Sequence, residues 1–183
     1  MQSKIKKSIT ALLLITSISA CKKDKELPPV EENELITTIR LKFTNKANAS
    51  DVKFYDWKDL DGQGGNAPSI DQVILSQNSM YKLEIASILN ETAVPAGDIK
   101  QEIKDEAHAH LFVYKPLPAS LLAVTITDRD KNNLPIGFVA DLATTTAGSG
   151  KLQIILRHQM GSKNGTEQPG STDLDASFDL TIQ

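Results

Sequence analysis

The chain of 183 residues contains a single cysteine, Cys21, and few aromatic residues: Phe, Trp and Tyr together make up 5% of it. A single cysteine excludes a disulfide bond within the chain. The scarcity of aromatic side chains weakens a carbohydrate-binding interpretation. The sequence also lacks a G-x-S-x-G motif, a phosphate-binding loop and a Cys-His nucleophile pair. We therefore expect a protein that is not an enzyme.

Basic residues are also fewer than acidic residues. The chain carries 20 Lys and Arg residues against 23 Asp and Glu, a net charge of −3. Loss of the first twenty residues as a signal peptide, argued below, removes three lysines and no acid, which leaves 17 basic against 23 acidic residues, or −6. A domain with this balance lacks the basic surface that a phosphate backbone requires. We expect no nucleic-acid partner.

The longest apolar run lies at the start of the chain. Residues 1–20, MQSKIKKSITALLLITSISA, place three lysines before an apolar stretch that is too short for a permanent membrane span. Ile18-Ser19-Ala20-Cys21 matches the lipobox of bacterial lipoproteins, whereas the alternative is a chance cysteine beside an ordinary cleavage site. Lipid chains on Cys21 would anchor the protein to a membrane without crossing it. This predicts a membrane-anchored lipoprotein; the resemblance given below implies the outer membrane, with the protein facing either the periplasm or the cell surface.

The remaining residues divide into a short tether and one domain. Residues 21–33 are charged, contain two prolines and show no apolar periodicity, which indicates a solvated tether. Residues 34–183 are enough for a single domain with a substantial core.

Short runs of alternating or β-branched residues recur along this domain and are separated by turn signals. This pattern predicts a mainly β fold, an antiparallel β-sandwich of immunoglobulin-like or related Greek-key type. The expected strands are Leu35–Thr44, Val52–Trp57, Gln72–Ser76, Tyr81–Leu89, His110–Tyr114, Leu121–Thr127, Phe138–Thr144, Leu152–His158 and Ala176–Ile182.

One segment has helical rather than strand periodicity. Ile99, Ile103 and Ala107 share one face at helical spacing, and Asp98 precedes them as a plausible N-cap. Gln101 stands three residues after Asp98, as in a capping box. We expect one short helix near residues 98–107.

The end of this helix carries candidate metal ligands. Glu102 and Glu106 lie one turn apart, His108 and His110 follow, and His158 ends the strand KLQIILRH. Zinc and similar ions need three or four nitrogen or oxygen ligands, and these residues could supply them. The alternative is a solvated helix face with histidines at the ends of strands. The spacing matches no standard zinc motif.

Two acidic loops are weaker candidates for calcium. Asp59 and Asp61 begin DLDGQGGNAP, and Asp128 and Asp130 lie in TDRDKNNLPIG. The first loop has Ile70 where an EF-hand has its bidentate glutamate, so it is no complete EF-hand. In both loops the alternative is an ordinary strand connection rich in turn-forming residues. Residues 161–173, GSKNGTEQPGSTD, are expected to form a further long loop.

Several stretches together resemble a family of small lipoproteins from Bacteroidota, and the resemblance covers nearly the whole of the chain after residue 20. They are ELITT, DLDGQGGNAP, PAGDIKQEI, EAHAHLFVY, DRDKNNLPIG, LRH and STDLDASFDLTIQ. Members are often labelled as type 1 periplasmic-binding-fold proteins and accompany TonB-dependent receptors. That label implies an alternating α/β architecture, which the strand pattern of this chain does not support.

The resemblance also bears on the site. The family's acid and histidine before an aromatic pair fall on Glu106 and His110, and its L-R-H ends at His158. The chain departs from the pattern at Ala109, where relatives have Glu, and at Met160, where they have proline. The resemblance implies an accessory protein that helps an outer-membrane receptor handle a nutrient, such as a metal or metal complex. The competing hypothesis is a structural or adhesive lipoprotein with no small-ligand site.

Overall fold

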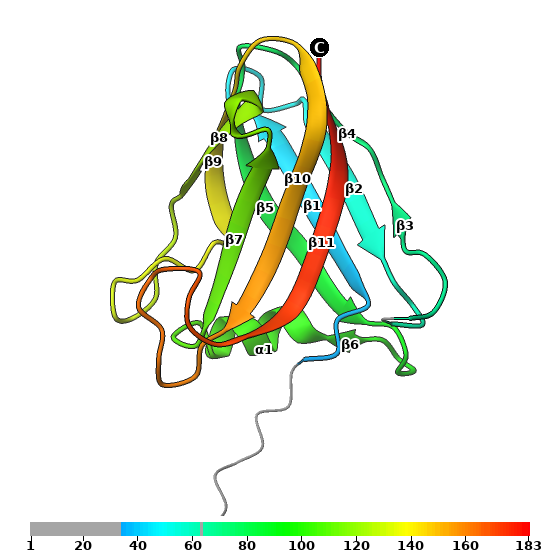
Figure 1. The fold of residues 1–183 in the computed structure, drawn as a ribbon, viewed down its shortest axis with the longest axis vertical. Coiled ribbons are helices and arrows are strands. Elements are labelled where there is room, and N and C mark those ends of the chain that lie inside the picture. The colour runs from blue at the N-terminus through cyan, green and yellow to red at the C-terminus, as the bar shows by residue number, and fades with distance from the viewer. Residues whose placement is uncertain (1–33, 63) are drawn as a thin grey trace, which may run out of the picture. The chain divides into compact units, whose positions relative to one another are not determined.

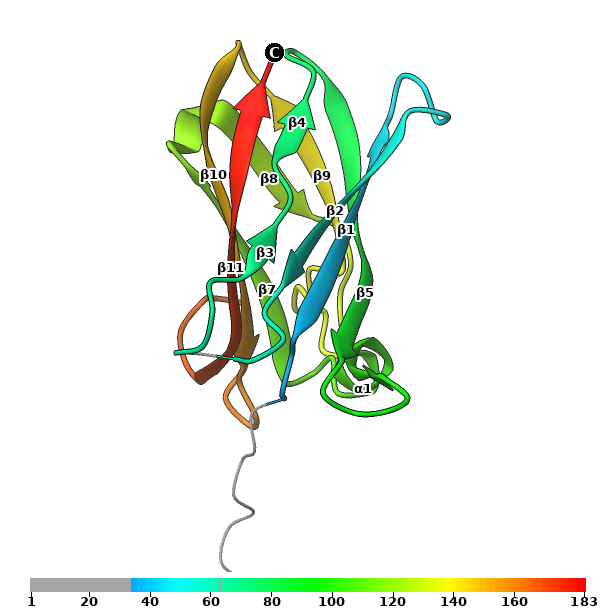
Figure 2. The same cartoon turned by 90° about the vertical axis from the view of Figure 1, so that its right-hand side faces the viewer.

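The computed structural model describes residues 34–62 and 64–183, so the expected signal peptide, lipidated Cys21 and tether lie outside the described residues. Within the described part, two β-sheets pack face to face as a sandwich (Figures 1 and 2). None of the helices in these residues has the length and apolar content needed to cross a bilayer. The predicted β-sandwich with one short α-helix is confirmed.

The larger sheet has the strand order β3-β2-β1-β5-β9-β8, with β6 paired to β5. The smaller sheet has the order β4-β11-β10-β7, and its pairs are antiparallel except for β4 with β11. The strands of the larger sheet are β1 (Thr38–Asn45), β2 (Val52–Lys58), β3 (Ser69–Ile70), β5 (Met80–Asn90), β6 (Gly97–Asp98), β8 (Leu122–Ile126) and β9 (Val139–Thr144). Those of the smaller sheet are β4 (Val73–Leu75), β7 (His110–Leu117), β10 (Gly148–His158) and β11 (Ser171–Ile182).

The core lies between the sheets and follows the alternation of the sequence. In β1, Ile39, Leu41 and Phe43 are fully buried, and Phe178 is fully buried in β11. Each strand therefore gives one face to the core, where burial of a large apolar side chain stabilises the fold by about 1.5–3 kcal/mol.

The α-helix α1 (Ile99–Asp105) lies at the end of the sandwich opposite the C-terminus (Figure 1). The Asp98 side chain accepts a hydrogen bond from the backbone N–H of Lys100, so the predicted N-cap forms. Ile103 is fully buried and fastens the helix to the core. The predicted capping box does not form, because no hydrogen bond from the Asp98 backbone N–H to the Gln101 side-chain oxygen is present among the described residues; the Gln101 NH2 group donates to Asp105.

The nine expected strands are all present, with differences at their ends. The short strands β3 and β6 were not predicted, since two residues carry no readable alternation, and a 3-10 turn, η1 (Ala119–Leu121), precedes β8. The prediction that the loop extends to Asp173 is wrong at its C-terminal end. Strand β11 already begins at Ser171, because its backbone pairs with His158 at the end of β10.

Candidate metal centre

Two of the predicted ligands meet across neighbouring strands. His110 opens β7 and His158 closes β10, and the antiparallel register pairs these two residues directly. Their ring centroids are 4.6 Å apart. His110 is fully buried and His158 is 5% exposed. The sequence alone does not show that residues 48 positions apart lie side by side. The pairing of β7 with β10 brings them together.

A β-bulge adds a carboxylate to the two histidines. In the pairing of β10 with β11, Leu156 faces Leu174 whereas Arg157 faces Thr172, so the register shifts by one residue at Asp173. Strict alternation would point Asp173 away from the core, on the side opposite Leu174. The bulge turns it inward, and its side chain is fully buried.

Glu34 supplies the fourth side chain from the segment that leads into β1. Its Oε1 lies 2.9 Å from His110 Nε2, and its Oε2 lies 3.7 Å from His158 Nδ1. Asp173 Oδ2 lies 3.7 Å from His110 Nε2 and 3.9 Å from His158 Nδ1. One donor atom from each of the four residues lies within 4.8 Å of the others. The Glu34 side chain is 7% exposed, so the whole cluster is close to dry.

The spacing of these donors suits a metal ion. Tetrahedral zinc with bonds of about 2.0–2.1 Å holds its donors about 3.3 Å apart. The distances from a histidine nitrogen to the nearer carboxylate oxygen of each acid run from 2.9 to 3.9 Å, with the two oxygens of Glu34 facing different histidines, and one donor atom from each residue lies within 4.8 Å of the others. Two imidazoles with two carboxylates are typical ligands of zinc and neighbouring divalent transition metals. Calcium prefers six to eight oxygen ligands, which this cluster does not offer.

The hydrogen bonding of His110 also favours a cation at this position. Its Nδ1 lies 3.1 Å from the backbone carbonyl oxygen of Glu106, which can only accept, so Nδ1 carries a proton. In the neutral ring, Nε2 would then direct its lone pair at a Glu34 carboxylate oxygen 2.9 Å away. Two lone pairs at that distance repel, so either a second proton or a metal ion must lie between them. An N–H donated to a backbone carbonyl is also the usual outer contact of a metal-binding histidine.

His158 is the least satisfied member of the cluster. Both of its ring nitrogens are buried, and neither has a hydrogen-bond partner among the described residues. A buried polar group left in this state costs about 1–3 kcal/mol. Its Nδ1 faces the carboxylates of Glu34 and Asp173 at distances too long for a hydrogen bond but suitable for ligands of a shared ion.

Burial and hydrogen bonding act in opposite directions on Glu34. Burial raises the pKa of its carboxyl group, but hydrogen bonding, above all with His110, outweighs burial and lowers that pKa from 4.5 to about 2. Glu34 is therefore a carboxylate at neutral pH, as a metal ligand must be.

The structure separates the other predicted ligands from this cluster. Glu102 is exposed on α1, and His108 is half-buried just before β7. Glu106 takes part through its backbone carbonyl, which holds His110, rather than through its carboxylate. Ala109 is fully buried and its carbonyl accepts from the backbone N–H of Gln159, which ties the ends of β7 and β10 together.

The residues that were missed are Glu34 and Asp173. Glu34 lies just before the first predicted strand, and Asp173 lies at the end of a predicted loop. No spacing or motif in the sequence marked either residue as a ligand.

In the predicted calcium loops the acidic side chains hold the loops themselves. Asp59 accepts from the backbone N–H of Gly62, and Asp61 accepts from the backbone and side chain of Asn66. Asp128 accepts from two backbone N–H groups, those of residues 137 and 138. Asp130 accepts from two others and binds a lysine. In the described part of the chain, none of the four belongs to a group of three or more possible ligands close enough to share an ion.

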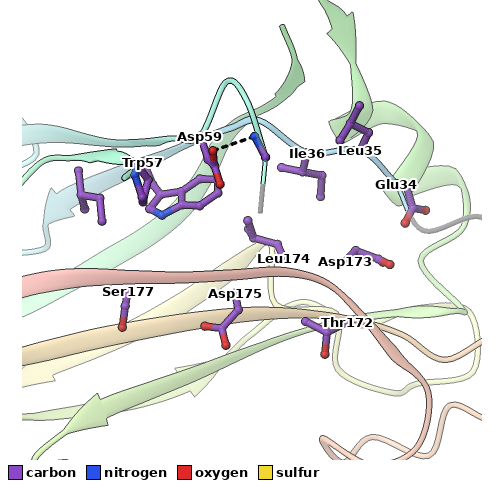
Figure 3. Close-up of a pocket in the computed structure, with 13 residues that line it drawn as sticks. Glu34, Leu35, Ile36, Trp57, Asp59, Thr172, Asp173, Leu174, Asp175 and Ser177 are labelled. Carbon is purple, nitrogen blue, oxygen red and sulfur yellow. Dashed lines mark hydrogen bonds between the residues drawn. The ribbon is translucent and has the colours of Figure 1, made fainter. Parts of the chain in front are cut away.

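A cleft of about 470 Å³ opens beside the cluster, between the β2–β3 edge of the larger sheet and β11. Glu34 and Asp173 lie at one end of it, and Trp57 lies further along (Figure 3). Comparison with protein-family models, with curated proteins and with solved structures finds no match. The interpretation of the site therefore rests on its own geometry.

Proposed function

We propose that this protein is a lipid-anchored lipoprotein of the outer membrane that binds a divalent transition-metal ion, with zinc as the first ion to test. Glu34, His110, His158 and Asp173 would be its ligands. The proposed role is binding and not catalysis. The predicted lipobox at Cys21 supports the anchor, and the buried cluster supports the ion.

The observation that carries this proposal is the state of His158. A buried imidazole with no hydrogen-bond partner among the described residues, facing two carboxylates, is costly unless something binds it. A divalent cation would satisfy the lone pair of Nδ1 and the charge of both carboxylates at once. A second proton on His110 would explain the contact of that ring with Glu34, but it would leave His158 unsatisfied.

The resemblance to Bacteroidota lipoproteins supports an accessory role beside a TonB-dependent receptor, in which the protein holds a metal ion or metal complex for uptake. The second candidate is a structural or adhesive lipoprotein. It requires no small-ligand site, and failure of metal binding would favour it.

The test is calorimetric titration of the metal-stripped full chain with zinc. We expect one-to-one binding, weakened at least about 100-fold in His158→Ala, because loss of a direct ligand should exceed the 10- to 100-fold cost of losing an outer contact. His158→Ala removes no hydrogen bond among the described residues, so the fold should survive, and circular dichroism checks this.

His108→Ala is the matched control, because it removes a nearby histidine that lies outside the cluster. It should bind zinc like the wild type. Zinc at one hundred times its Kd should also stabilise the wild type by about 2.7 kcal/mol, which raises Tm by roughly 5–10 °C. If zinc, cobalt and nickel all give no heat beyond dilution and no rise in Tm, the metal proposal fails and the adhesive role becomes the better one.

A further inference from the structure

The cluster of two histidines and two acids is closed to solvent. The side chains of His110 and Asp173 are fully buried, and those of His158 and Glu34 are 6% and 7% exposed. Four protein donors also fill the positions around a tetrahedral ion, as in closed zinc sites. An ion held here can therefore enter or leave only after one of the four side chains has moved away.

Three of these side chains belong to paired strands of the smaller sheet. His110 opens β7, His158 ends β10 directly opposite it, and Asp173 lies within β11. Movement of the backbone at any of them would disturb the pairing of these strands. Glu34 is the exception, because it precedes β1 and lies outside both sheets.

The segment that carries Glu34 is fixed at its other end by Thr37. The backbone N–H and the hydroxyl group of Thr37 donate to the carbonyl of Leu89, at 2.9 and 3.1 Å, and its own carbonyl accepts from the backbone N–H of Asp59. No backbone–backbone hydrogen bond joins residues 34–36 to another described residue. Thr37 is therefore the point at which the backbone of the segment becomes fixed.

Ile36 packs the segment against the core. Its side chain is 8% exposed and lies in the hydrophobic core, whereas the neighbouring Leu35 is 53% exposed. Residues 34–36 also line one end of the cleft of about 470 Å³, so the segment has room to move away from the cluster when Ile36 leaves the core.

We propose that residues 34–36 form a latch, which opens to admit and release the metal ion. Glu34 is the ligand that leaves first. Ile36 is a positioning residue, because its packing holds Glu34 in place and so sets the rate at which the ion exchanges. This inference rests on the proposed metal site and names the path by which the ion enters and leaves.

The experiment measures how fast the zinc-loaded full chain releases its ion to an excess of a chromogenic chelator. Truncation of a buried isoleucine to alanine shifts an equilibrium by more than tenfold, so Ile36→Ala should release zinc at least about tenfold faster than the wild type. Because the truncation loosens the latch both with and without the ion, the calorimetric Kd should change by less than about threefold. A rate that changes without the affinity distinguishes the latch from a loss of ligands.

Leu121→Ala is the matched control. Leu121 is 7% exposed and lies beside Gly148 at the start of β10, whereas His158 ends that strand. The variant removes a buried aliphatic side chain of the same size far from the latch, so its release rate should stay within about threefold of the wild type. Urea unfolding checks that the two alanine variants lose similar stability.

Ile36→Val is a smaller truncation of the same side chain. It should release zinc about two- to tenfold faster than the wild type, and it carries the test if Ile36→Ala does not fold. Release at the wild-type rate in the Ile36 variants, or equally fast release in Leu121→Ala, would overturn the latch and leave zinc binding, and with it the proposed function, intact. Absence of zinc binding in the wild type would remove both.

Discussion

Two groups of buried charged side chains in the described part of the chain invite comparison, and they differ in how well they are satisfied. In the first, Lys163 and Asp130 form an ion pair of 2.9 Å, with side chains 2% and 1% exposed. Lys163 also donates to the carbonyl of Ala107, and Asp130 accepts from two backbone N–H groups. In the second, the cluster of Glu34, His110, His158 and Asp173, both ring nitrogens of His158 lack a hydrogen-bond partner among the described residues.

The proposal of metal binding rests on this difference. The lysine and its partners fasten the loop after β10 to the loop after β8, and no further ligand is needed there. The cluster of Glu34, His110, His158 and Asp173 is similarly buried, but both ring nitrogens of His158 in it lack a hydrogen-bond partner among the described residues, which is why we propose that it holds a cation. A buried acid thus indicates a ligand site only where its surroundings remain unsatisfied.

The largest effect is expected when the ion pair of Lys163 and Asp130 is broken. Asp130→Ala leaves the Lys163 ammonium group buried without its carboxylate, which should destabilise the fold by about 3–5 kcal/mol in urea unfolding. The double variant Asp130→Ala, Lys163→Met removes both charges and should recover most of that loss. A cost below about 1 kcal/mol for the single variant would show that the pair contributes little.

A smaller effect is expected when the unsatisfied cluster is titrated without metal. Because its folded-state pKa is lowered from 4.5 to about 2, Glu34 contributes stability that is present above pH 4.5 and is lost as pH falls toward 2. The contribution is at most about 3 kcal/mol. Urea unfolding in EDTA between pH 2 and 6 should therefore give a flatter stability curve for Glu34→Gln than for the wild type.

Glu102→Gln is the matched control for this titration, since it makes the same chemical change on the exposed face of α1. Its stability curve should follow that of the wild type. If Glu34→Gln follows the wild type as closely, Glu34 is not held as a carboxylate by its neighbours.

The smallest effect should come from calcium. The carboxylates of Asp61, Asp128 and Asp130 already accept hydrogen bonds within their own loops. Millimolar calcium added to metal-stripped protein should therefore shift Tm by less than about 1 °C, whereas zinc raises it. A calcium-dependent rise in Tm that disappears in Asp61→Asn or Asp130→Asn would place a calcium site in these loops after all.

Much of the fold could be predicted because it follows local rules. Alternation in Ile39, Leu41 and Phe43 identified a strand with one buried face, and Asp98 marked the start of the helix. The two-residue strands β3 and β6 could not be predicted, since their pairing is imposed by β2 and β5 rather than by their own sequence.

The candidate site was only half predictable. His110 and His158 stood out as histidines at strand ends, but their meeting depends on the register of β7 with β10. Asp173 faces the two histidines because of the bulge in the pairing of β10 with β11. Glu34 faces them because of the path that the chain takes into β1. The positions of Glu34 and Asp173 in the sequence indicate neither the bulge nor the path of the chain into β1. Glu102, by contrast, was favoured by its spacing from Glu106, yet its side chain faces solvent.

The bulge at Asp173 has a consequence for how such a site could arise or disappear. An added residue in a strand is one codon, and here that codon brings both a carboxylate and the local twist that directs it inward. Its deletion would let Thr172 and Leu174 resume regular alternation beside β10, and the sandwich would lose one of the four side chains of the cluster while its core stayed paired. A sandwich with the complete cluster and a sandwich without it could thus differ by a single codon. Both forms could keep the same fold.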